Sequence, residues 1–130
     1  MADETYPDDL RYHPEHDWAR VEGDEAVFGI TWYAQDALGE VVYFDQPSVG
    51  AAVTKDGSYA EIESVKAVSD VIAPASGEIT AVNTSLADTP ETVNGDPYGA
   101  GWLVRVRLSD PSELDRLMDA QAYRDYLAGL

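Results

Sequence analysis

The sequence predicts a single, mainly β domain that contains one short internal helix and ends in a helical segment. Three observations support this: short apolar runs separated by turn residues fill residues 18–108, the period becomes helical over 31–39, and helix-capping residues introduce 110–127. The 130 residues suffice for one hydrophobic core. We therefore expect one domain over residues 1–130, with an acidic N-terminal segment over 1–9 and a C-terminal helical segment over 110–127.

A β-hairpin followed by a short helix is predicted first. The stretch WARVEGDEAVFGIT, residues 18–31, holds two candidate strands around the turn formers Gly23 and Asp24. The spacing of apolar residues then changes from that of a strand to that of a helix. Thr31 is a suitable N-cap, and Gly39 suits the position just past the end of a helix. We expect a short helix between them.

Five further short strands are predicted in the middle of the chain. EVVYFDQP, residues 40–47, is a compact strand that ends at Pro47. Residues 48–64 supply two short strands around the turn KDG, and residues 67–83 supply another pair, interrupted by PASG.

A long ordered loop and a last strand follow. Residues 84–101 are rich in proline, glycine and asparagine, which predicts a loop over one edge of the sheet. The stretch GWLVRVRLSD then alternates apolar and basic residues. We expect Leu103, Val106 and Leu108 to face the core of a half-buried strand, with Val104 out of register.

The C-terminal segment carries helix-start signals. Asp110 is a candidate N-cap, Pro111 suits the first helical position, and Glu113 stands where a capping box needs its carboxylate. An apolar stripe follows at helical spacing, and we expect it to pack onto the sheet; its residues are Leu114, Leu117, Met118 and Ala122.

The charge balance is strongly acidic, with 25 acidic against 8 basic residues and a formal net charge of −17. Nucleic acids and anionic membranes need a basic patch, so neither is an expected partner. Two interpretations of the acidity stay open: steering towards partners with basic docking surfaces, and adaptation to high salt, which the preference for arginine over lysine also suggests.

Catalytic and metal-binding residues are scarce. The chain has no cysteine, which excludes a thiolate nucleophile, a disulfide redox centre and a cysteine metal site. Its two histidines, His13 and His16, flank Pro14 and have no evident third ligand, so no metal site is predicted. No nucleophile elbow or phosphate-binding glycine loop is present. We therefore expect no catalytic residues.

The compartment can also be predicted. No apolar run approaches the length of a membrane-spanning helix, about 20 residues. The start, MADETYPDDL, has neither a basic n-region nor an apolar h-region, although a processed chain could look the same. A cytoplasmic location is expected.

The stretch EIESVKAVSD holds Lys66, one of two lysines in the chain. A strand with alternating residues runs up to this lysine and another begins after it, so Lys66 is predicted at or beside the tip of a β-hairpin. A lysine there often serves only to solubilise the protein, and Glu63 could pair weakly with it. Lys55, in the turn TKDG, also looks exposed.

Several linked motifs resemble the glycine cleavage system H proteins. They are HPEHDW, GIT–AQ–LGEVV, ESVKAVSD, AP–SGEI–AVN, VN–DPYGAGWL and SELDRLMDAQAY, in the family's order and spacing over about residues 10–126. In that family the lysine of ESVKA carries (R)-lipoate in amide linkage. The resemblance therefore implies N6-lipoyllysine at Lys66 and a recognition motif formed by Glu63, Ser64, Val65 and Ala67.

The resemblance implies a non-catalytic carrier. In the family, a pyridoxal-phosphate glycine decarboxylase loads the lipoyl arm with the aminomethyl group of glycine. A tetrahydrofolate-dependent aminomethyltransferase unloads it, and a flavin dihydrolipoyl dehydrogenase reoxidises the dihydrolipoyl arm. A lipoate ligase or an octanoyl or lipoyl transferase attaches the lipoate. A carrier that visits several enzymes is expected to be monomeric.

Three alternatives stand beside this interpretation. Lipoyl domains of 2-oxoacid dehydrogenases also present a hairpin lysine, but they typically have Asp-Lys-Ala and are shorter. Biotin carriers usually have methionine on both sides of the lysine, where this chain has Val65 and Ala67. The third alternative is an interaction module that keeps the fold without the lipoyl group.

The family also suggests a fold and an arm-binding cleft. Its members are flattened β-sandwiches of two antiparallel sheets, the lipoyl-domain-like barrel-sandwich hybrid, with flanking helices. They usually read His-Glu-Trp where this chain has His16-Asp17-Trp18. The resemblance implies that Asp17 faces the loaded arm in a surface cleft, although Asp17 could be an ordinary exposed acid. His16, Ser69 and Asp70 are further candidates for the cleft.

Overall fold

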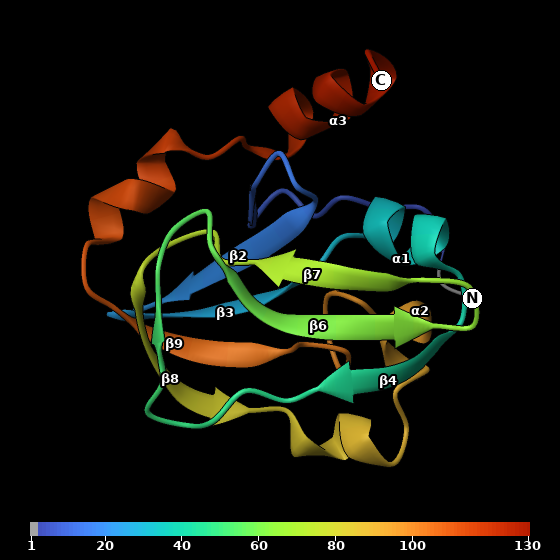
Figure 1. Cartoon of the computed structure of the whole chain (residues 1–130). Helices are drawn as coiled ribbons and strands as arrows, with labels where there is room; N and C mark the ends of the chain where they lie inside the picture. Colours follow the sequence, from blue (N-terminus) through green and yellow to red (C-terminus); the bar gives the residue numbers. More distant parts are fainter. Residues whose placement is uncertain (1–2) are drawn as a thin grey trace.

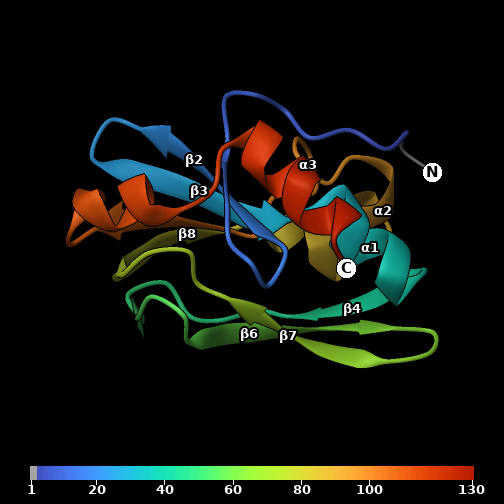
Figure 2. The same ribbon diagram turned by 90° about the horizontal axis from the view of Figure 1, so that it is seen from above.

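Two open antiparallel sheets pack face to face in the computed structural model, which describes residues 3–130 (Figure 1). The expected acidic N-terminal segment therefore has its first two residues outside the described part. One sheet has the order β1-β2-β3-β9-β8-β5 and the other the order β4-β6-β7. Figure 2 shows the two layers from above, with α3 beside the larger sheet. The predicted flattened β-sandwich is confirmed.

The strands and helices have the following bounds. The larger sheet consists of β1 (Arg11–Tyr12), β2 (Asp17–Glu22), β3 (Glu25–Ile30), β9 (Val104–Leu108), β8 (Gly77–Val82) and β5 (Ala52–Val53). The smaller sheet consists of β4 (Val41–Asp45), β6 (Ser58–Ser64) and β7 (Val68–Ile72). The helical elements are α1 (Trp32–Leu38), η1 (Thr84–Ala87), α2 (Thr92–Gly95), η2 (Pro111–Arg116) and α3 (Ala120–Ala128).

The first hairpin and α1 form as predicted. Strands β2 and β3 pair in register around Gly23, whose φ of 68° is accessible to glycine without strain. The Thr31 side chain accepts a hydrogen bond from Ala34 N and caps α1, and Gly39, with φ 80°, ends it. These local signals decide the structure because turns and caps depend on nearby residues.

The pairing of the middle strands depends on distant residues instead. Each of the two stretches 48–64 and 67–83 contributes one strand to each sheet, with β5 on β8 and β6 on β7. Each stretch therefore crosses once from one sheet to the other, and two backbone hydrogen bonds join the two crossing segments. Asp56 N donates to Ala73 O at 2.9 Å, and Ala73 N donates to Gly57 O at 2.9 Å. Local hydrophobic periodicity cannot reveal which strand of each stretch belongs to which sheet.

The stretch 84–101 is ordered, as expected, but it is not a plain loop. It contains the helical turns η1 and α2, and it buries Leu86 and Val93 in the core between the sheets. The turns form because apolar side chains hold the segment against the sheet edge.

Strand β9 corrects the predicted register. Val104, Val106 and Leu108 alternate inward along the strand, whereas Leu103 is buried just before the strand begins. Val104 is therefore in register, and Leu103 is the residue outside the alternation.

The C-terminal helical segment is two helices rather than one continuous stripe. Asp110 caps η2 by accepting from Ser112 N, but Glu113 accepts from Ser76 N at 2.7 Å and does not close a capping box. The chain becomes extended at Leu117, with ψ 163°. The contact of Glu113 with the distant residue Ser76 therefore replaces the predicted capping box.

The second helix, α3, has its own cap and its own buried face. Asp119 accepts from Ala122 N, and the helix buries Ala120 and Tyr123 while Ala122 is exposed. Leu114 and Leu117 of the predicted stripe are buried, so only the first half of the stripe faces the core.

A second apolar cluster holds α3 and the N-terminal segment on the outer face of the larger sheet. Its buried members are Tyr6, Leu10, Tyr12, Trp18, Val27, Ala120 and Tyr123. Trp18 is fully buried, and Trp32 and Trp102 are partly buried against this cluster.

The net charge of −17 gives a prediction about salt. Like charges on the folded surface repel, and salt screens them, with a Debye length of about 10 Å at 0.1 M. We expect the melting temperature to rise from low to molar potassium chloride, roughly 4 °C for each kcal/mol of relieved repulsion. Calorimetric scans across that range measure it, and a flat or falling curve would contradict both self-repulsion and salt adaptation.

Candidate functional site

Lys66 lies in the turn that joins β6 to β7, at the end of the smaller sheet (Figure 1). Glu63 and Val68 form the last pair of the ladder, and Ser64 N donates to Ala67 O at 2.8 Å across the turn. The buried Ser64 hydroxyl accepts from Lys66 N at 3.2 Å and from Ala67 N at 3.1 Å. The serine next to the lysine thus fixes the backbone of the turn.

The surroundings of Lys66 leave its amine accessible. The residue is exposed and makes no ion pair within 4 Å in the described part of the chain, so the weak pair with Glu63 that the sequence allows is not formed. Val65 is 66% exposed, and Val65 N donates to Glu40 O at 3.1 Å. The side-chain stem of Lys66 lies close to Gly39, with Cε 3.5 Å from where a β-carbon of that residue would be.

Lys55 differs from Lys66. Its side chain is only 22% exposed, and its Nζ lies 3.6 Å from Asp56 Oδ1. The expectation that Lys55 is also exposed is therefore wrong, because its side chain is largely covered. The cause is the crossing between the sheets, where Lys55 N also donates to Ser76 Oγ at 2.9 Å.

Asn94 fixes the segment on which Lys66 rests, and the sequence reasoning missed it. Its Nδ2 donates to Gly39 O at 2.9 Å and to Gln35 Oε1 at 3.0 Å, and its Oδ1 accepts from Val41 N at 2.8 Å. Asn94 and Gln35 are buried, and Gln35 Nε2 donates to Trp32 O at 3.0 Å, so the oxygen and nitrogen of both amides have partners. The only sequence signal was an asparagine within an apolar-anchored loop.

A cleft of about 610 Å³ begins beside the lysine turn and runs between β7 and α1. It brings together all four residues predicted for it, His16, Asp17, Ser69 and Asp70, together with Ala67 of the turn. The apolar part of its wall comes from Ile30, Ala34, Ala37, Leu38, Val68, Val71 and Ile72. Residues from four separate stretches of sequence therefore share one concave surface.

Asp17 is the most buried acid of this cleft, at 1% exposure. The interpretation of Asp17 as an ordinary exposed acid is therefore wrong: it is the first residue of β2 and pairs with Ile30. Its Oδ1 accepts from Ile72 N at 3.3 Å. Burial raises the pKa of the Asp17 carboxyl well above its ordinary range, against the lowering effect of the Ile72 hydrogen bond.

This shift gives a prediction about stability. Because the pKa of Asp17 is raised on folding, its stabilising contribution is present below its ordinary pKa of about 4 and is lost as the pH rises through the raised value. Asp17→Asn keeps an acceptor for Ile72 N without a charge. We expect the variant to be about 1–3 kcal/mol more stable than the parent near neutral pH, with the gain vanishing in acid. Urea unfolding at several pH values measures it, and an equal effect at every pH would contradict it.

His16 has an unusual backbone. Its φ of 73° is left-handed, which is uncommon outside glycine, and two backbone bonds hold it there: His16 N to His13 O at 2.9 Å, and Thr31 N to His16 O at 3.0 Å. Its Nδ1 lies 2.8 Å from Tyr123 Oη. Burial lowers the pKa of the His16 imidazole.

His13 lies apart from this cleft. Its Nε2 bonds to Asp56 Oδ1 at 2.6 Å, and its Nδ1 accepts from Glu15 N at 3.0 Å. The two histidines therefore have different partners, and residues 3–130 contain no group of three or more side chains arranged to hold a metal ion.

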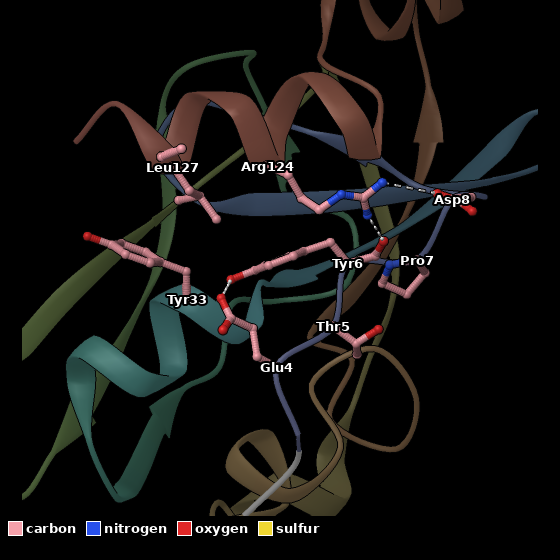
Figure 3. A pocket seen from close by; sticks show the side chains of 9 residues that line it. Glu4, Thr5, Tyr6, Pro7, Asp8, Tyr33, Arg124 and Leu127 are labelled. Carbon is pink, nitrogen blue, oxygen red and sulfur yellow. Dashed lines mark hydrogen bonds and ion pairs between the residues drawn. The ribbon is translucent and has the colours of Figure 1, made fainter.

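A larger cavity of about 830 Å³ lies between the N-terminal segment and α3 (Figure 3). Tyr6 Oη donates to Glu4 at 2.9 Å, and Arg124 Nη1 donates to Tyr6 O at 3.3 Å. Its wall contains neither Lys66 nor any residue of the β6–β7 turn, and Tyr33 is the residue that it shares with the cleft. The smaller cleft, beside the lysine, is therefore the candidate site.

Comparison with known proteins identifies the family. The family profile "Glycine cleavage H-protein" matches residues 10–129. The chain belongs to this family. The resemblance seen in the sequence motifs is thereby confirmed.

Relatives agree over almost their whole length. The glycine cleavage system H protein of Symbiobacterium thermophilum is 51% identical over 117 residues, which cover 90% of this chain and 91% of that protein. The H protein of Myxococcus xanthus is 52% identical over 123 residues, which cover 95% of each. The crystal structure of an H protein from Mycobacterium marinum has a TM-score of 0.85 and 42% identity, covering 95% of this chain and 99% of that one.

No helix among residues 3–130 has both the length and the apolar character needed to cross a membrane.

Proposed function

We propose that this H-protein family member is the lipoyl carrier of the glycine cleavage system, with (R)-lipoate in amide linkage to Lys66. The observation that carries the proposal is the setting of Lys66: an exposed amine on a turn fixed by the Ser64 hydroxyl, beside a cleft. A fixed turn presents one amine to a modifying enzyme, with Glu63, Val65 and Ala67 beside it.

The cleft fits an arm attached at Lys66. The lysine stem lies against Gly39 at the end of α1, and Ala34, Ala37 and Leu38 of that helix line the cleft. This apolar path from the turn to the buried Asp17 suits a hydrocarbon chain with a polar end. When attached, the lipoyl group supplies the two reactive sulfurs that a chain without cysteine lacks.

Asp17 is the residue proposed to hold the cargo. A buried carboxylate that faces an aminomethyl group forms a charge-assisted hydrogen bond with its amine, and the apolar walls keep water out. The cationic amine would in turn favour the ionised form of Asp17. His16, Ser69 and Asp70 complete the polar end of the cleft.

The protein acts as a substrate of other enzymes and supplies no catalytic residue of its own. It takes the aminomethyl group of glycine from a pyridoxal-phosphate glycine decarboxylase to a tetrahydrofolate-dependent aminomethyltransferase. It then presents the dihydrolipoyl arm to an FAD dihydrolipoyl dehydrogenase. Lipoate ligase, or an octanoyl or lipoyl transferase, completes the set of partners, and we propose a cytoplasmic monomer.

Lipoylation of purified variants tests the proposal. A lipoate ligase with lipoate and ATP should add one lipoyl group to the parent chain and to Lys55→Arg, and none to Lys66→Arg, as measured by intact mass. Arginine keeps the charge but cannot form the amide. A lipoyl group on Lys66→Arg, or none on the parent, would refute the assignment.

A further inference from the structure

Tyr123 joins α3 to the cleft through two hydrogen bonds. It is buried, and its Oη lies 2.8 Å from His16 Nδ1 and 2.9 Å from Thr31 Oγ1. Thr31 Oγ1 also accepts from Ala34 N at 3.2 Å, since it is the N-cap of α1. The three side chains form a continuous chain of contacts from a helix start, through the C-terminal helix, to the cleft residue His16.

The protons of this chain can be assigned by counting donors and acceptors. The Thr31 hydroxyl is fully buried and has one proton to donate, and within the described chain the Tyr123 oxygen is its only side-chain or backbone acceptor. Thr31 therefore donates to Tyr123. The Tyr123 proton is then directed to His16 Nδ1, which must be unprotonated, so the proton of the neutral ring is on Nε2.

The ring of His16 is also fixed in orientation. It packs against Tyr33, with centroids 4.5 Å apart, and against Tyr123 and Tyr126 at 5.9 and 6.1 Å. The charged and titratable groups near it are Glu15, His13 and Asp17 on its own segment, Tyr33 of α1, Tyr123 and Tyr126 of α3, and Asp70 across the cleft. Desolvation of the ring adds to the preference for its neutral form.

We propose that Tyr123 is a positioning residue that holds His16 as the neutral Nε2–H tautomer in the cleft. This inference rests on the proposed function for its biological meaning: a neutral His16 does not repel the cationic amine that Asp17 binds. Protonation of Nδ1 would place three protons, on Nδ1, Tyr123 and Thr31, at two contacts, so one hydroxyl proton of this buried group would be left without an acceptor.

The first test needs no lipoyl group. Nitrogen-15 NMR of the histidine rings in the unmodified protein should show His16 with an unprotonated Nδ1 and a protonated Nε2. In Tyr123→Phe the Nδ1 resonance should move and the pKa of His16 should rise towards its ordinary value. Tyr126→Phe keeps the ring contact and removes a hydroxyl that does not bond to His16, so it is the matched control. Thr31→Ala provides a second break in the chain.

The NMR test has two results that contradict the proposal. A protonated Nδ1 in the parent, or unchanged His16 resonances in both Tyr123→Phe and Thr31→Ala, would overturn the proposal.

The second test uses the lipoylated, aminomethyl-loaded protein. Tyr123→Phe should release the aminomethyl group about threefold faster than the parent or Tyr126→Phe, with the difference growing as the pH falls through the pKa of His16. An unchanged release rate would overturn the role of Tyr123 in the cleft. If the chain takes no lipoyl group at all, the proposed function fails, while the NMR result still decides the tautomer.

Discussion

Replacing Lys66 by arginine is expected to abolish glycine–bicarbonate exchange with the glycine decarboxylase. The exchange needs the lipoyl sulfurs, and the chain offers no cysteine in their place. Arginine keeps the positive charge on the turn but cannot form the amide. The fold should be unaffected, because Lys66 is exposed and the turn is held by Ser64 and by the Ser64–Ala67 backbone bond.

Lys55→Arg is the matched control, since it changes the other lysine of the chain and leaves the turn intact. We expect near-parental exchange, measured as incorporation of labelled bicarbonate into glycine after lipoylation. Residual exchange by Lys66→Arg above the unmodified parent would place the lipoyl group elsewhere.

Asp17→Asn is expected to shorten the lifetime of the aminomethyl-loaded protein by about 30-fold or more. This follows because losing one partner of a desolvated charge pair typically costs at least about 2 kcal/mol. Asp17 is 1% exposed and lies in a cleft whose walls are largely apolar, where its interaction with a cation is strong. Release of formaldehyde or ammonia from the isolated loaded protein measures the lifetime.

Two comparisons isolate the effect. Glu61→Gln removes an exposed carboxylate from β6 that is not part of the cleft, so its loaded form should match the parent. Reduction of the unloaded arm by dihydrolipoyl dehydrogenase should proceed at the parental rate in Asp17→Asn, because no amine is present. Equal lifetimes for Asp17→Asn and the parent would remove Asp17 from the cargo site.

The same substitution is expected to stabilise the empty protein near neutral pH. A buried carboxylate with a raised pKa and one hydrogen bond is unfavourable for folding alone. Stability and retention of the cargo are therefore expected to change in opposite directions at Asp17, as is common where a site needs a poorly solvated charge.

Features set by nearby residues could be predicted from the sequence. The Gly23 turn, the Thr31 cap and the Gly39 terminator are local, and each stands where predicted. Lys66 is in the predicted hairpin turn because the two strands beside it alternate regularly and pair with each other. The family followed from motifs linked over most of the chain, which no local property reveals.

Features set by distant residues could not be predicted. The assignment of β5 to the larger sheet and β6 to the smaller one depends on contacts between the two segments that cross from sheet to sheet. Glu113 accepts a hydrogen bond from Ser76 N instead of closing a capping box. The difference between the two lysines follows from the same crossings. Tyr123 is 107 residues away from His16 in the sequence, so no local pattern relates the two residues.

Asp17 also shows the difference between what the sequence predicts and what the fold decides. Its motif marked it as a candidate through resemblance, but only the fold places Ile72 and the walls of α1 and β7 around it. The family resemblance predicted which residues belong together in the site. Their protonation and solvent access depended on packing that the sequence does not contain.

Peptide mapping by mass spectrometry of the protein isolated from its own cells shows directly which amine carries the lipoyl group. We expect a single lipoyl group, on the peptide that contains Lys66, with Lys55 and the α-amine unmodified. A lipoyl group on Lys55, or Lys66 unmodified throughout the isolated protein, would contradict it.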